Sequence, residues 1–470
     1  MRPPAPNPAL TGRPASPWRL VPGRTLRTLG LLACLACARP TAQAAPDRAT
    51  ESEIYALIRD PSSADWRALA RFNGSITRRE FENSLNRVFD PWSGLRTYLK
   101  IDDSSVTVYP QPGPRGAPLV TVRFARARWT STRRLQASWR QPIGVPGHPL
   151  AGLHVAIEPA DIGGAWAALE DRSAEFPGYG RIKEGDLNLI VGRILRDKLT
   201  ALGADVFLVR DRAEPILPIA REHLLPFVEH LLRDHPEQLP GALRSEFAGR
   251  VFRSPDALRA SAGLLLTKTL ETRARAALVR ENFKPDLTIV LQHDATPESS
   301  RGQLTPVNRN IFFVDGAYLP KELRHSEQRF RLLTKVFEHV SPLETEVAVA
   351  VADRFQRATG YPPVLYGNSA TTRLVVKGNL YVVARNLDFN REHDGPVVVT
   401  EPYFMNQPET LARLLAGDYP GVRIIAGHPC RSIFREYADC VVDGLLASRD
   451  AFNRGRRPAM TSQRDRRRGG

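Results

Sequence analysis

The sequence contains few cysteines, and it lacks a hydrophobic run long enough to make the chain a polytopic membrane protein. Cys34 and Cys37 fall within a short apolar N-terminal segment, so their C-x-x-C spacing does not indicate a metal or redox centre. Cys430 and Cys440 allow two interpretations, a disulfide formed in an oxidising compartment or two buried thiols. The cysteines of this sequence therefore do not indicate the function of the protein.

Recognisable nucleic-acid-binding motifs are also absent from the sequence. The chain has 470 residues and a formal net charge of +16, which comes mainly from arginine. This charge favours contact with an anionic polymer or lipid head groups. A genomic composition that favours arginine codons would also produce it. No helix-turn-helix, zinc-finger or RNA-binding signature accompanies the charge, and we therefore predict no nucleic-acid partner.

The first 44 residues are typical of an export signal. Arginines precede a short apolar run at residues 29–38, and Ala-Gln-Ala at residues 42–44 forms a cleavage site. We therefore predict a signal peptide over residues 1–44 and a periplasmic or cell-envelope location. Residues 31–34 also resemble a bacterial lipobox, which would make Cys34 a lipid anchor; cleavage after residue 44 is the alternative.

The remainder divides by pattern into three parts. Residues 45–149 predict a small α+β accessory module that ends in a proline- and glycine-rich linker. In this module Thr77 and Glu80 fit a capping box at the start of a helix. The module either docks or contacts substrate, or it is a packing extension of the main domain. Residues 150–447 form the predicted main domain, and residues 448–470 form a basic tail predicted to be disordered.

The main domain opens with a strand–helix–strand crossover at residues 153–210. The apolar residues 155–157 end in the segment Glu-Pro-Ala-Asp-Ile-Gly-Gly at residues 158–164. Apolar residues then recur at helical spacing over 187–202, and residues 206–209 predict the next strand. Such a crossover predicts an α/β fold with a mostly parallel, twisted sheet flanked by helices, whose sites lie beyond the carboxyl ends of the strands.

Further along the chain the same patterns continue to alternate. The sequence predicts strands at 287–293, 311–314 and 396–401, and helices at 254–283, 323–356 with a break near Pro342, 408–415 and 433–446.

Several of these strands finish with ionisable residues. The first ends with Glu158 and Asp161, a later strand ends with His293, and the last ends with Glu401. Glu184 lies at the start of the crossover helix. Two carboxylates and an imidazole with one open position make a zinc site, and a further carboxylate can act as general base. Each residue alone could also be an ordinary loop or capping residue.

Four segments resemble, in order, the motifs of the zinc-dependent N-acetylmuramoyl-L-alanine amidases, which cleave peptidoglycan. They are Ile-Glu-Pro-Ala-Asp-Ile-Gly-Gly at 157–164, Lys-Glu-Gly-Asp-Leu-Asn-Leu at 183–189, Leu-Gln-His-Asp-Ala at 291–295, and Val-Thr-Glu-Pro-Tyr-Phe-Met-Asn-Gln-Pro-Glu at 399–409. The resemblance covers about residues 150–446 and implies an amidase-like α/β fold.

The resemblance implies that Glu184 and His293 are zinc ligands and that Glu401 is the catalytic carboxylate. Glu401 would take a proton from a metal-activated water and pass it to the leaving amine. The bond cut would be the amide between N-acetylmuramic acid and the first L-alanine of the stem peptide.

Asp161 occupies the position at which the family has its first histidine ligand. Aspartate can bind zinc, but the added negative charge would raise the pKa of the metal-bound water and weaken the metal as a Lewis acid. Two hypotheses follow, a metal-dependent amidase with Asp161, Glu184 and His293 as ligands, or an amidase-fold protein that has lost catalysis and binds the wall or regulates wall enzymes.

Two groups of residues are candidates for contact with substrate. Arg385, Asn386 and Arg391 precede the Glu401 strand and could hold stem-peptide carboxylates, or they are ordinary loop residues. The glycine pair is followed by Trp166, Glu170 and Arg172, which either line the groove or pack the loop.

Overall fold

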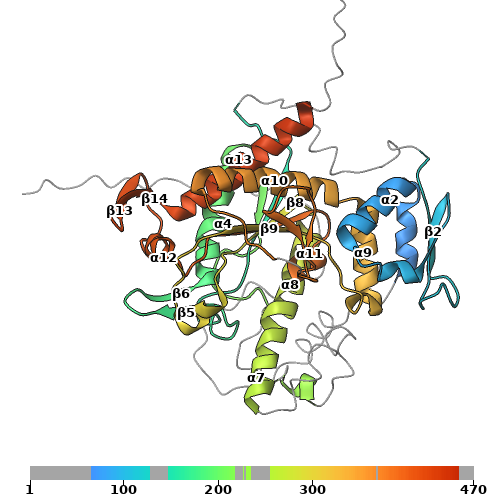
Figure 1. The fold of residues 1–470 in the computed structure, drawn as a ribbon, viewed down its shortest axis with the longest axis horizontal. Coiled ribbons are helices and arrows are strands. Elements are labelled where there is room, and N and C mark those ends of the chain that lie inside the picture. The colour runs from blue at the N-terminus through green and yellow to red at the C-terminus, as the bar shows by residue number, and fades with distance from the viewer. Residues whose placement is uncertain are drawn as a thin grey trace, which may run out of the picture. The chain divides into compact units, whose positions relative to one another are not determined.

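The computed structural model describes residues 65–126, 147–217, 226, 229–233, 255–366 and 369–454 (Figure 1). The predicted signal peptide, the candidate lipid anchor Cys34 and most of the predicted linker lie outside the described residues. None of the described helices is both long enough and apolar enough to cross a membrane.

The N-terminal segment is α+β, as predicted. Its capping box is present, since the Thr77 hydroxyl accepts from the Glu80 N–H at 3.3 Å and the Glu80 carboxylate accepts from the Thr77 N–H at 3.1 Å. The reciprocal bonds satisfy donors that the first turn of the helix would otherwise leave unpaired. The elements are η1 (Trp66–Phe72), α2 (Arg78–Ser84), η2 (Leu85–Phe89), η3 (Leu95–Tyr98), β1 (Leu99–Ile101), β2 (Ser105–Val108) and β3 (Val120–Arg123), and the three strands form an antiparallel sheet.

The main domain is built on a seven-stranded, mostly parallel sheet, which confirms the predicted fold class. The strand order is β10-β11-β9-β12-β8-β4-β7. Strands β7, β4, β8 and β12 are parallel neighbours; β9 runs antiparallel to β12, β11 parallel to β9, and β10 antiparallel to β11. The strands are β4 (His154–Pro159), β7 (Asp205–Leu208), β8 (Leu287–Leu291), β9 (Asn310–Val314), β10 (Arg373–Leu374), β11 (Val382–Ala384) and β12 (Val397–Pro402).

Helices cover both faces of this sheet (Figure 1). On one face lie α4 (Glu184–Ala201), α10 (Ser341–Thr359) and α13 (Ile433–Arg454). On the other lie α8 (Glu271–Asn282) and α11 (Asp388–Glu392). The remaining elements are β5 (Ser173–Phe176), β6 (Gly180–Lys183), α7 (Pro255–Leu264), η5 (Leu265–Leu270), η6 (Pro297–Arg301), η7 (Glu322–Arg324), α9 (Ser326–Glu338), α12 (Pro408–Leu415), β13 (Val422–Ile425) and β14 (His428–Arg431).

Two features near the C-terminus bear on the predictions made from the sequence. Helix α13 continues to Arg454, so the first residues of the predicted disordered tail are helical. The rest of that tail lies outside the described residues. Cys430 and Cys440 are both buried and free, which is the thiol interpretation.

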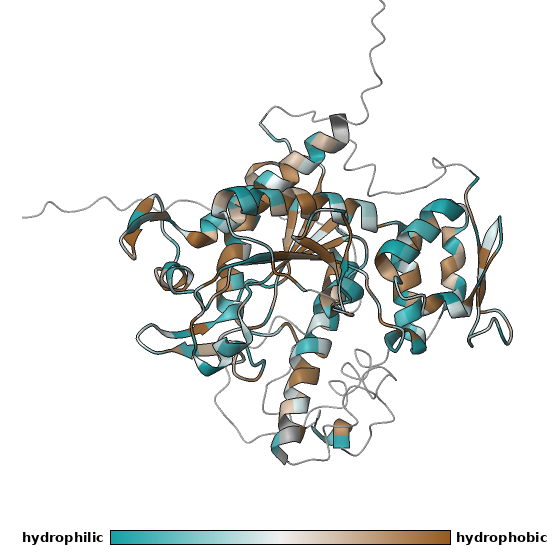
Figure 2. Cartoon of the chain, in the orientation of Figure 1, coloured by the Kyte–Doolittle hydropathy of each residue, from teal (hydrophilic) through white to brown (hydrophobic). Residues whose placement is uncertain are grey.

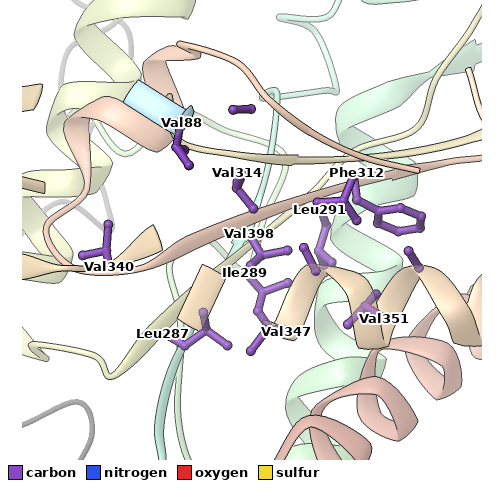
Figure 3. Close-up of a cluster of buried hydrophobic side chains, with 14 of the residues drawn as sticks. Val88, Leu287, Ile289, Leu291, Phe312, Val314, Val340, Val347, Val351 and Val398 are labelled. Atoms are coloured by element: carbon purple, nitrogen blue, oxygen red, sulfur yellow. The ribbon is translucent and has the colours of Figure 1, made fainter. Parts of the chain in front are cut away.

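The sheet provides the hydrophobic core. Its strands are the most uniformly apolar part of the chain in Figure 2, as expected for strands covered on both faces. Successive side chains of β4 pack on opposite faces of the sheet. Val155 and Ile157 join the core cluster shared with α4, whereas Ala156 packs with Val279 of α8. Figure 3 shows side chains of β8, β9 and β12 meeting those of α10.

The N-terminal segment shares this core. Val88 belongs to the cluster in Figure 3, and its carbonyl accepts from the N–H of Ala317, beyond the end of β9, at 2.7 Å. Phe337 of α9 stacks on Phe72 and Phe81, with centroid distances of 5.9 and 5.4 Å. These contacts support the second interpretation of the segment, a packing extension of the main domain.

Candidate functional site

Three motif residues meet at the carboxyl edge of the sheet. Strands β4, β8 and β12 are adjacent and parallel, so the residues that follow them gather at one edge. A pocket of about 380 Å³ opens there, and Glu184, His293 and Glu401 line it. Its other polar lining residues are Asp171, Arg172, Ser173, Gln292, Asp294, Thr296, Ser299 and Ser300. The predicted convergence of these three residues is therefore present in the structure.

Helix α4 positions His293. Asn188, one turn along α4 from Glu184, places its Oδ1 atom 2.8 Å from Nδ1 of His293 and donates from Nδ2 to the Ala160 carbonyl at 3.0 Å. Because Nδ2 is the donor group of Asn188, its Oδ1 accepts and Nδ1 of His293 carries the hydrogen. Burial lowers the pKa of His293 to about 3, so the ring is neutral at physiological pH and its Nε2 atom has a free lone pair.

The loop after β4 is held by the carboxylate of Glu170. The buried carboxylate of Glu170 accepts from the N–H of Ile162 at 2.7 Å and from that of Gly163 at 3.2 Å. Burial raises the pKa of Glu170 to about 7. Glu170 therefore has the loop-packing role, whereas Arg172 lines the pocket.

Asp161 lies against two cations. Its Oδ1 atom is 2.9 Å from Nζ of Lys268 and 3.6 Å from Nε of Arg172. The Arg172 Nε atom is also 3.7 Å from Oε2 of Glu184. Burial opposes ionisation of Asp161, but the charges of Lys268 and Arg172 outweigh burial and hold its pKa well below the usual range. For Glu184, burial and the charge of Asp161 raise the pKa well above the usual range.

Two further acids face the same pocket with raised pKa values. Burial raises the pKa of Asp294 to about 7. Burial also raises the pKa of Glu401 well above its usual range, and the charges of Asp294 and Glu184 add to that effect. Protonated carboxyl groups donate hydrogen bonds, so near neutral pH this pocket offers donors as well as acceptors to a ligand.

The side chains do not fit the zinc ion that the resemblance implies. Within the ranges described, no group of three or more His, Cys, Asp or Glu side chains could hold a metal ion. One atom does suit a cation, because Oδ2 of Asp161 is buried without a hydrogen-bond partner. However, the ammonium group of Lys268 already pairs with the other oxygen of that carboxylate. The assignment of Asp161, Glu184 and His293 as zinc ligands stays a prediction.

Glu158, the other acid at the end of β4, points away from the pocket. It is fully buried, with Oε1 at 3.5 Å from Nη1 of Arg275 and Oε2 bonded to Nε2 of His393. A buried acid paired in this way has a structural role.

The predicted substrate-binding residues separate into two groups. Arg385 lies near the pocket, since its charge acts on both Glu401 and Asp294. Asn386 instead donates to Glu322 at 3.0 Å and accepts from Arg391 at 2.8 Å. The guanidinium group of Arg391 also pairs with Asp388 and is largely buried, so Asn386 and Arg391 bind each other and do not line the pocket.

Sequence reasoning missed Lys268 and Asp294. Lys268 lies in the apolar stretch Leu-Leu-Leu-Thr-Lys-Thr-Leu at residues 264–270. A charged residue in such a stretch indicates a buried partner of opposite charge, and this pattern could have identified Lys268. Nothing in the local pattern identified Asp161 as its partner, because the two are 107 positions apart.

Comparison with known proteins gives matches among solved structures only. No protein-family model matches the chain, and no curated protein matches it. Similar structures include the N-acetylmuramyl-L-alanine amidase Ami1 of Mycobacterium smegmatis, with 15% identity, 64% of this chain and 98% of that chain covered, and a TM-score of 0.35.

Two further similar structures are amidases. The Clostridioides difficile amidase CwlD, in complex with the GerS lipoprotein, has 10% identity, coverage of 64% and 99%, and a TM-score of 0.35. The catalytic domain of the amidase CwlV of Bacillus (Paenibacillus) polymyxa has 12% identity, coverage of 63% and 98%, and a TM-score of 0.33. Likeness at this level carries no conclusion about activity.

Proposed function

We propose that this chain is an exported protein whose sheet-edge pocket binds peptidoglycan without a zinc ion. The observation that carries the proposal is the pocket itself. It gathers Glu184, His293 and Glu401 from three of the amidase-like motifs, while Asp161 from the remaining motif is ion-paired to Lys268 at 2.9 Å. These residues leave a pocket for a ligand, and the carboxylate of Asp161, which stands at the position of the family's first metal ligand, is paired with a cation.

The chemistry of the pocket suits a muropeptide, the glycan–peptide unit of peptidoglycan. Thr296, Ser299 and Ser300 offer hydroxyl groups, and Asp294 and Glu401 offer protonated carboxyl groups to amides and sugar hydroxyls. Arg172 in the lining and Arg385 nearby provide charge for the carboxylates of a stem peptide.

The remaining support comes from the sequence. The N-terminal residues are typical of an export signal, and the net charge of +16 favours an anionic polymer such as the cell wall.

Amidase activity is a second candidate. It is favoured by the presence of Glu401, the predicted catalytic carboxylate, in the same pocket as Glu184 and His293. Hydrolysis of the bond between N-acetylmuramic acid and L-alanine would be its signature.

Binding is tested by sedimentation of the purified chain with insoluble peptidoglycan in the presence of EDTA. Wild type should co-sediment with peptidoglycan. Ser299→Trp places an indole in the pocket, where it takes space from the ligand. This variant should bind at least about tenfold more weakly, a loss of about 1.4 kcal/mol or more. Ser104→Trp is the matched control, since Ser104 is exposed in the β1–β2 turn. Equal binding by the two variants would contradict the proposal.

Hydrolysis is tested by release of dye from labelled peptidoglycan. The proposal predicts no release above a protein-free blank. Zinc-dependent release that Glu401→Gln abolishes would instead establish the second candidate.

A further inference from the structure

We propose that Lys268, with Arg172, is a built-in replacement for a divalent metal ion at the Asp161–Glu184 carboxyl pair. The inference rests on the geometry of this pair and does not depend on whether the pocket binds peptidoglycan. It assigns a role to Lys268, which lies outside all four amidase-like motifs.

Two cations lie at the Asp161–Glu184 carboxyl pair. Nζ of Lys268 lies 2.9 Å from Oδ1 of Asp161, a charge-assisted hydrogen bond. Arg172 spans the pair, with Nε at 3.6 Å from Oδ1 of Asp161 and at 3.7 Å from Oε2 of Glu184. The ammonium and guanidinium groups together bring the two positive charges that a zinc ion would bring.

The carboxyl groups of the pair are buried. The side chain of Asp161 is only 1% exposed, so its negative charge needs a counter-charge within the protein. Lys268 enters from η5, a π-helical segment whose neighbouring residues Thr267 and Thr269 are buried. The side chain of Lys268 is 29% exposed, and its ammonium group reaches the buried carboxylate of Asp161 in the loop after β4.

The two cations also disfavour a metal ion at this position. A divalent ion bound to Asp161 would stand within a few ångströms of both Lys268 and Arg172, and like charges at that distance repel one another. Metal and lysine are therefore alternatives at this position.

Zinc titration of the purified chain tests the inference, with zinc content after dialysis and the shift in melting temperature as readouts. We expect wild type to retain no stoichiometric zinc and to show no zinc-dependent shift. Lys268→Met removes the charge and keeps the length of the side chain, and should bind zinc at least about tenfold more tightly than wild type, which is about 1.4 kcal/mol.

Two control variants make the test specific. Lys198→Met breaks the ion pair with Asp439, at 2.7 Å on the surface of α4, and should behave as wild type does. Lys268→Arg keeps the charge and should also remain free of zinc. Stoichiometric, tightly held zinc in wild type would overturn the inference, and so would equal zinc affinity in folded Lys268→Met and Lys198→Met.

If circular dichroism shows that Lys268→Met does not fold, wild type and Lys268→Arg decide the matter. Absence of stoichiometric zinc from both supports the inference, and zinc bound by either contradicts it. Because none of these readouts uses peptidoglycan, a failure here is distinct from a failure of wall binding.

Discussion

At the scale of single residues, this protein holds several acids in places where burial competes with hydrogen bonding. Asp90 shows the competition away from the pocket. Its carboxylate accepts from the N–H groups of Gly94, Leu95 and Arg96 at 2.7, 2.9 and 3.3 Å. Burial nevertheless prevails and raises the pKa of Asp90 to about 6.

Asp90 should therefore make stability depend on pH. Its folded-state pKa lies above the unfolded value, so its contribution is complete below about pH 4 and is lost as the pH rises through about 6. Asp90→Asn stays neutral, and the stability of this variant relative to wild type should increase by about 2 kcal/mol between pH 4 and pH 7. Urea unfolding across this range measures the difference, with Asp65→Asn, an exposed site, as reference. A difference that does not change with pH would contradict the prediction.

At the scale of elements, the junction between the loop after β4 and helix α4 positions the candidate site. Gly164 donates to Asp186 at 2.8 Å. Gly163 has a φ of +83°, and a Cβ atom there would lie 2.8 Å from the N atom of Asp186 and would also clash with its Oδ1 atom. The loop can approach the helix this closely only because residue 163 has no side chain.

Replacement of Gly163 by alanine should therefore lower the free energy of unfolding by more than backbone strain alone would. Gly178 is a matched control, because its φ is +80° and an added Cβ would meet no atom within 4 Å. Gly178→Ala should cost about 1–2 kcal/mol from the left-handed backbone alone. Gly163→Ala should exceed that by about 1–3 kcal/mol through overpacking, as measured by chemical denaturation. Equal costs would show that the loop does not pack on α4 as described.

Elements with strong local patterns were predictable, and short ones were not. Helix α12 was predicted with its observed bounds, and the break near Pro342 separates α9 from α10, because helical periodicity and proline act locally. No strand was predicted for the β5–β6 hairpin, since its strands have four residues each and little apolar alternation. The antiparallel direction of β9 depends on long-range pairing that no local pattern records.

The candidate site was predictable to the same extent. The placement of Glu184, His293 and Glu401 follows from parallel strands that end at one edge, and the structure brings these residues to one pocket. The pairing of Lys268 with Asp161 depends on how η5 packs across the loop after β4, which the sequence pattern does not encode.

At the scale of the whole molecule, the N-terminal segment and the sheet domain share one core within the compact unit Pro46–Gly470. Phe337 is fully buried at their junction, where it stacks on Phe72 and Phe81. A shared core of this kind predicts cooperative unfolding.

Phe337→Ala should destabilise both parts together, by about 3–5 kcal/mol for a buried aromatic residue. Tryptophan fluorescence, to which Trp66 and Trp92 of the N-terminal segment contribute, and far-UV circular dichroism should report one shifted midpoint. Phe283→Ala, which removes a stack on Phe207 at 5.4 Å elsewhere in the sheet domain, is the comparison. Two separate transitions in wild type would show that the segment is an independent module.

The central claim is that the pocket binds peptidoglycan and that lysine takes the place of the metal. Co-sedimentation of the wild-type chain with insoluble peptidoglycan, with and without EDTA, combined with zinc analysis of the bound protein, tests it most directly. The account predicts equal binding in both conditions and no stoichiometric zinc. Binding that EDTA abolishes and zinc restores, with one zinc per chain, would contradict it.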